Sequence, residues 1–74
     1  MTYSIIGIFS SQVITIDTID DDKMAKILKR RDWDKLLCVL AILASQSRGL
    51  PFLFNEVYLK KGDFIICKIW ERVN

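Results

Sequence analysis

The sequence has no histidine, and it has little cysteine, glycine or proline. Histidine is the commonest general base near neutral pH, and without it neither a serine nor a cysteine triad of the usual form can be assembled. Its glycines, Gly7, Gly49 and Gly62, are too scattered for a phosphate-binding loop or a dinucleotide fingerprint. These absences predict a protein that binds rather than catalyses, and that carries no cofactor.

Potential metal ligands are equally sparse. Cys38 and Cys67 are too few for a zinc site, and each lies in an apolar run, which favours a buried thiol over a redox-active one. The aspartates at positions 17 and 20–22 could offer oxygen ligands, but their spacing lacks the glycine and terminal glutamate of a calcium loop. We therefore expect no metal site and interpret this acidic cluster as a helix cap.

Length and composition favour one domain over residues 1–74. A hydrophobic fraction of 51% with 27% charged residues is typical of a folded chain rather than a disordered one. A chain this short gains little net stability from one core, and small domains often rely on disulfides, metals or oligomerisation. Because the first two are not indicated, we expect a homo-oligomer, most simply a homodimer.

The net charge of +2 is too weakly basic to mark a dedicated nucleic-acid binder. The longest uncharged apolar run, Leu36 to Ala44, has about half the length needed to cross a bilayer. The N-terminus also lacks the basic start of a signal peptide. The sequence therefore predicts a cytoplasmic protein that does not associate with membranes.

The first twenty residues have the pattern of a β-hairpin. Tyr3 to Ser10 is rich in isoleucine, and Val13 to Ile19 alternates between two faces with the period of a strand. The polar connection contains no glycine, which leaves the turn geometry open.

Two helices are expected next. Asp20 to Asp22 suit a helix N-terminus, and the apolar stripe that follows ends near Arg31. A second stripe lies nearly opposite the first, which indicates a break with Asp32 as the second cap; its members are Trp33, Leu36, Leu37, Leu40, Leu43 and Ala44. The second helix should end at Ser45 to Arg48, because Gly49 suits a left-handed C′ residue and Pro51 prevents continuation.

The C-terminal third predicts another hairpin. Phe52 to Leu59 and Phe64 to Arg72 flank a Lys-Lys-Gly sequence that is typical of a three-residue turn with a glycine bulge. Pairing Leu59 with Asp63 then gives a core face, composed of Leu53, Asn55, Val57, Ile65, Cys67 and Ile69. The fold class that results is α+β: a β-hairpin, two helices and a β-hairpin (ββααββ), with an antiparallel sheet covered by helices on one face.

The other face of this second hairpin is our predicted binding site, because aromatic residues laced with charge are enriched at recognition surfaces. Its residues are Phe52, Phe54, Tyr58, Phe64, Lys68, Trp70 and Arg72. Trp70 is the expected anchor. Two alternatives stay open: an edge or terminal segment covers this face, or the face stacks nucleic-acid bases while Lys23, Lys26 and Arg30 of the first helix contact phosphates. Those three basic residues fit a solvated helix face equally well.

The sequence thus predicts a small stand-alone regulator or inhibitor that docks its aromatic face on a larger protein or on its own copy. A nucleic-acid-binding module is the alternative function. Eleven isoleucines and seven lysines fit a gene of low GC content, and together with the small size they suggest a bacteriophage product.

Overall fold

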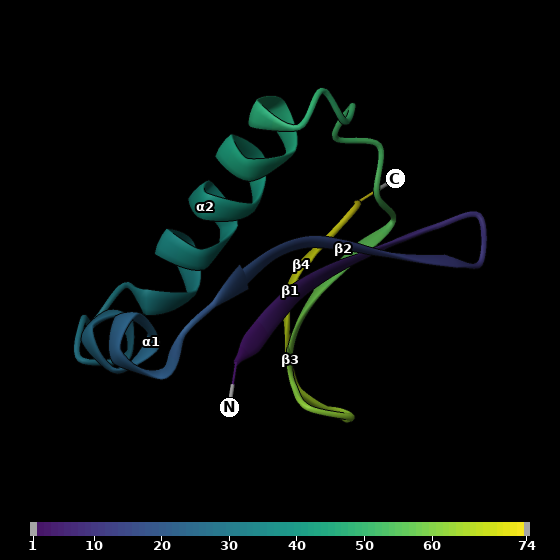
Figure 1. The fold of residues 1–74 in the computed structure, drawn as a ribbon. Helices are drawn as coiled ribbons and strands as arrows, with labels where there is room; N and C mark the ends of the chain where they lie inside the picture. The colour runs from purple at the N-terminus through teal and green to yellow at the C-terminus, as the bar shows by residue number, and fades with distance from the viewer. Residues whose placement is uncertain (1, 74) are drawn as a thin grey trace.

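The strands and helices follow one another in the order ββααββ in the computed structural model, which describes residues 2–73 (Figure 1). Their bounds are β1 Tyr3–Phe9, β2 Gln12–Ile19, α1 Asp21–Leu28, α2 Trp33–Ser47, β3 Glu56–Lys61 and β4 Phe64–Glu71. The four strands form one antiparallel sheet in the order β2-β1-β3-β4, with both helices on the same side. The predicted α+β fold class is confirmed.

The two aspartates predicted to cap the helices both occupy N-cap positions, but only one of them makes the capping hydrogen bond. The Asp20 carboxylate accepts a hydrogen bond from the Lys23 backbone N–H at 2.7 Å and so caps α1. Asp32 occupies the N-cap position of α2 but makes no side-chain cap; its carboxylate instead accepts from Arg30 Nε at 3.3 Å. The predicted helix break is confirmed, whereas the predicted capping bond of Asp32 is wrong.

The end of α2 is a complete Schellman motif. Gly49 has a φ of +68°, and its N–H donates to the Gln46 carbonyl at 3.1 Å. The Leu50 N–H donates to the Ser45 carbonyl at 2.8 Å. This stop reverses the chain sharply, as predicted, and directs Leu50 and Pro51 back toward the sheet.

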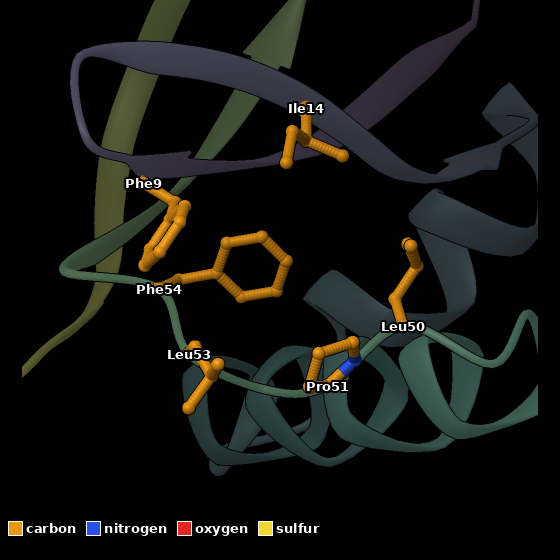
Figure 2. A pocket seen from close by; sticks show the side chains of 6 residues that line it. All are labelled: Phe9, Ile14, Leu50, Pro51, Leu53 and Phe54. Atoms are coloured by element: carbon orange, nitrogen blue, oxygen red, sulfur yellow. The ribbon is translucent and has the colours of Figure 1, made fainter.

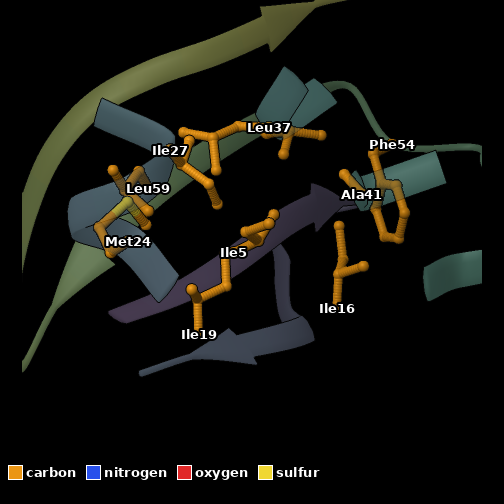
Figure 3. Packing of buried hydrophobic residues seen from close by; sticks show 10 residues of the cluster. Ile5, Ile16, Ile19, Met24, Ile27, Leu37, Ala41, Phe54 and Leu59 are labelled. Carbon is orange, nitrogen blue, oxygen red and sulfur yellow. The ribbon is translucent and has the colours of Figure 1, made fainter. Parts of the chain in front are cut away.

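The core lies between the sheet and the two helices (Figure 3). Its buried members are Ile5, Ile16, Ile19, Met24, Ile27, Leu37, Ala41, Phe54, Val57 and Leu59. The innermost line of α2 is Leu37, Ala41 and Ser45, and the Ser45 hydroxyl donates to the Ala41 carbonyl at 2.8 Å. Leu43, expected in the core stripe, is 54% exposed, because at 100° per residue it lies on the side of α2 opposite Ala41 and Ser45.

The register of the second hairpin differs from the prediction. Lys61 pairs with Phe64, so the turn has two residues, Gly62 and Asp63, instead of three. The pairing then slips twice, because β4 carries an extra residue at Ile66 and another at Ile69. Each slip moves the following side chains to the other face, so the predicted alternation of β4 does not hold.

The shorter turn and the two bulges together change which residues of β4 face the helices: the turn decides the facing of Ile65, and the bulges decide that of the residues after it. Trp70 packs against the core cluster together with Cys67 and Ile69, although it was expected on the opposite face. Ile65, expected in the core, is exposed. The prediction was correct for Cys67 and Ile69 and wrong for Trp70 and Ile65.

Residues 51–55 form no strand, although the pattern predicted one from Phe52 onward. In this irregular segment Phe54 turns inward and is 2% exposed, whereas Leu53 turns outward and is 53% exposed. The predicted facing of both residues is therefore reversed.

Candidate functional site: an apolar pocket

A small pocket opens between the β1–β2 hairpin and the chain that follows α2 (Figure 2). Its volume is about 100 Å³, and six apolar residues line it: Phe9, Ile14, Leu50, Pro51, Leu53 and Phe54. The Phe54 ring lies at the centre of these side chains. Phe9 and Leu53 are both exposed and form part of the rim.

Backbone hydrogen bonds hold the pocket wall against the sheet. The Leu53 N–H donates to the Pro51 carbonyl at 2.9 Å, which tightens the segment after α2. The Asn55 N–H donates to the Ile8 carbonyl at 2.7 Å, and the Arg72 N–H donates to the Asn55 carbonyl at 2.9 Å. The wall is thereby attached to β1 on one side and to the chain after β4 on the other.

Gly7 makes room for the Phe54 ring, which lines the pocket. A Cβ atom at this position would lie 2.6 Å from Cε1 and 2.7 Å from Cγ of Phe54, which is far inside van der Waals contact. A glycine inside a strand often marks such a close approach. The isoleucine-rich strand can therefore accept the Phe54 ring close to its backbone only because residue 7 has no side chain.

Arg48 seals the sheet edge beside the pocket. Strand β2 is an edge strand with an extra residue at Ile16, and Arg48 Nη1 donates to the carbonyls of Thr15 at 2.7 Å and Ile16 at 3.1 Å. Bulges and covered carbonyls both prevent another strand from pairing with an edge. The Thr15 and Ile16 carbonyls are therefore not free to pair with another strand.

The structure does not bring the seven predicted binding residues together on one face. Phe52, Phe54 and Trp70 form an aromatic cluster on the helix side, with ring centroids 5.3 Å apart for Phe52 and Phe54 and 5.2 Å for Phe52 and Trp70. The Arg72 guanidinium lies 5.6 Å from the Trp70 ring centroid, and its Nε donates to the Phe54 carbonyl at 3.3 Å. This cluster backs the pocket and contributes to the core.

Tyr58 and Lys68 lie on the other face of the sheet, where they form a polar network. The Tyr58 hydroxyl donates to Glu56 at 2.6 Å, and Lys68 pairs with Glu56 at 3.2 Å and with Glu71 at 3.1 Å. The hydrogen bonds that Glu56 accepts from Tyr58 and Lys68 lower the pKa of Glu56, and those that Lys68 donates to Glu71 and Glu56 raise the pKa of Lys68. The positive charge of Lys68 is thus paired with the carboxylates of Glu56 and Glu71.

The other predicted contacts are dispersed. Phe64 is highly exposed at the start of β4, next to the hairpin turn. Lys23 and Lys26 are exposed on α1, and Arg30, also exposed, pairs with Asp32 in the turn that follows. Their contact with phosphates remains a prediction.

Both cysteines are half-buried free thiols rather than fully buried ones. Burial raises the pKa of Cys67, and the Asp34 carboxylate raises it further. Within residues 2–73, no three side chains of the types that hold metals come together. None of the helices in this range is long and apolar enough to cross a membrane.

Comparisons of the chain with protein-family models, with curated proteins and with solved structures find no match. The chemistry of the pocket therefore has to be inferred from its own residues. Of the six lining residues, sequence reasoning selected only Phe54, and it did so for a different face. Gly7 in the first strand was the available signal, because it indicates that something approaches the backbone there.

Proposed function

We propose that this protein is a protein-binding module whose apolar pocket receives one large apolar side chain of a partner protein. The observation that carries the proposal is the combination of a concave, fully apolar lining with exposed leucine and phenylalanine at the rim. Apolar anchors in well-packed pockets supply much of the energy of protein interfaces. The partner is a larger protein that this chain regulates or inhibits in the cytoplasm.

The size of the pocket favours a side chain over a metabolite. Sites for small molecules usually enclose about 300–1,000 Å³ and include a few polar groups that orient the ligand. This pocket encloses about 100 Å³, somewhat less than the roughly 150 Å³ apolar cavity that accepts benzene. A leucine, isoleucine or methionine side chain fits that space, and an apolar lining offers a water molecule no hydrogen-bond partner.

The sealed edge of β2 narrows the class of partner further. Because Arg48 covers the Thr15 and Ile16 carbonyls, an extended peptide cannot pair along this part of the sheet. We therefore propose that the anchor projects from a helix or a loop of the partner.

Selection from a random peptide library tests the proposal directly. The library is selected on the immobilised protein, and the enriched peptides are compared on two variants, Leu53→Asp and Leu43→Asp. The two leucines form a matched pair, because they are 53% and 54% exposed, yet only Leu53 lines the pocket. We expect enriched peptides that share one aliphatic anchor and that lose about ten-fold or more in affinity on Leu53→Asp alone.

Two results would count against the proposal. One is a set of peptides that binds Leu53→Asp as tightly as the unchanged protein. The other is the absence of selectable peptides together with tight, strongly salt-dependent binding of single-stranded DNA or RNA, which would favour the alternative function.

A further inference from the structure

The tip of the β3–β4 hairpin carries a second apolar surface, at the opposite end of the strands from the pocket. Lys61 pairs with Tyr3 and with Phe64 at this end of the sheet, whereas the pocket residue Phe9 ends β1 at the other. The two hairpin turns project in different directions (Figure 1). Whatever binds here leaves the pocket accessible.

We define the hairpin patch as Lys61, Gly62, Asp63, Phe64 and Ile66. These residues line an open hollow with a volume of about 400 Å³. Phe64 is 79% exposed and Ile66 is 49% exposed. Because Phe64 and Ile66 line the same concave surface, they form a contiguous apolar patch, and exposed patches of this kind mark interaction sites more often than scattered apolar residues do. The patch is therefore an interaction surface rather than part of the core.

Strand addition is not the way this surface is used. β4 is an edge strand, but its extra residues at Ile66 and Ile69 interrupt the regular row of backbone donors and acceptors. Docking through side chains into the concave surface is compatible with these bulges.

The charges of the patch make it complementary to itself. Lys61, the last residue of β3, and Asp63, in the hairpin turn, carry opposite charges and line this surface together with Phe64. The Lys61 ammonium also lies 4.9 Å from the centroid of the Tyr3 ring in the same chain. A two-fold axis can place Lys61 of one copy opposite Asp63 of the other, and the same contact is then repeated by symmetry. We propose that two copies of this chain associate through their hairpin patches, with each Phe64 ring entering the concave surface of the other copy.

The area predicts a weak, concentration-dependent dimer. Phe64 and Ile66 together expose roughly 250 Å² of apolar side chain, so two copies contribute about 500 Å², less than half of the 1,200 Å² at which stable interfaces begin. A weak, transient association that needs high protein concentration is therefore expected. The pockets then lie at the far ends of the dimer, although this inference does not depend on what the pockets bind.

Sedimentation equilibrium of the full chain, from low to high micromolar concentration, measures the association. We expect the mean mass to rise from 8.6 kDa toward twice that value. Phe64→Asp and the milder Phe64→Ser should each weaken the dimer by about ten-fold or more. Val13→Asp, at another exposed apolar site beyond the patch, should not weaken it, and circular dichroism verifies that each variant is folded.

Charge reversal tests the two-fold arrangement. Lys61→Asp and Asp63→Lys should each weaken association, because like charges then face one another, and the double variant should regain it. Recovery is decisive because Lys61 Nζ also lies 3.3 Å from the Tyr3 hydroxyl, so the single change alone could act within one copy. A constant mass of 8.6 kDa, unchanged association of Phe64→Asp, or a double variant that stays as weak as the singles would each overturn the proposal.

Discussion

Replacement of Gly7 by alanine should destabilise the protein through a single side-chain contact. The new methyl group would enter the space of the Phe54 ring, whose Cε1 and Cγ atoms would lie 2.6 and 2.7 Å away. Phe54 is 2% exposed and also touches the Phe52 ring, so the only space open to its ring is the small pocket that it lines. The strand or the ring must therefore shift.

Two opposing contributions determine the size of the effect. Extra volume in a packed core typically costs about 1–3 kcal/mol. Loss of glycine from a strand recovers about 0.5–1 kcal/mol, because alanine loses less conformational entropy on folding. We therefore expect Gly7→Ala to lower the free energy of unfolding by about 1–2 kcal/mol, a large fraction of the roughly 5 kcal/mol typical of a small domain.

Urea unfolding followed by circular dichroism measures this loss of stability. Repeating the Gly7→Ala change in a variant that lacks the Phe54 ring identifies its cause. In a Phe54→Leu variant the ring is absent, so Gly7→Ala should cost close to nothing or become slightly favourable. Gly49→Ala is a useful comparison, because a Cβ there meets no atom within 4 Å and the penalty comes from a φ of +68° alone. Equal losses for Gly7→Ala in both backgrounds, or no loss in the unchanged protein, would refute the proposed contact.

The packing and charge of the second hairpin lead to three further predictions. Trp70→Ala should lower the free energy of unfolding by about 2–3 kcal/mol in urea titrations, because the ring packs on the core; a fully folded variant of unchanged stability would contradict this. Cys67 should react slowly with a bulky disulfide reagent until denaturant is added, since burial raises its pKa; rapid labelling of the native thiol would contradict its position beside α2. Because the folded-state pKa of Glu56 is lowered, its stabilising contribution is present above the ordinary glutamate pKa and is lost as pH falls through the lowered value. Melting temperatures of Glu56→Gln should accordingly fall less on acidification than those of the unchanged protein, and parallel curves would count against the network.

The helix boundaries could be predicted from the sequence because their signals are local. Asp20 precedes the first helical turn by one residue, and its carboxylate reaches the backbone without help from the rest of the fold. Gly49 and Pro51 likewise stop α2 through backbone geometry that involves only their immediate neighbours. The order of strands and helices followed from the same local patterns.

The faces of β4 could not be predicted in this way. A strand has a side-chain period of two, so one extra residue reverses every later side chain. Bulges at Ile66 and Ile69 each do this, and nothing in an apolar run such as residues 64–67 distinguishes a bulged residue from a paired one. Trp70 therefore moved from a predicted binding face to the edge of the core.

The sequence by itself determined that the chain forms an α+β fold, where its helices begin and end, and that it has more apolar surface than one core can cover. Only the tertiary structure decided where that surface lies. The pocket depends on Gly7 of β1, Phe54 of the irregular segment and the chain reversal at Gly49, which are far apart in sequence. Their contact depends on strand order and register, because β1 and the segment before β3 become neighbours only when the two hairpins pair.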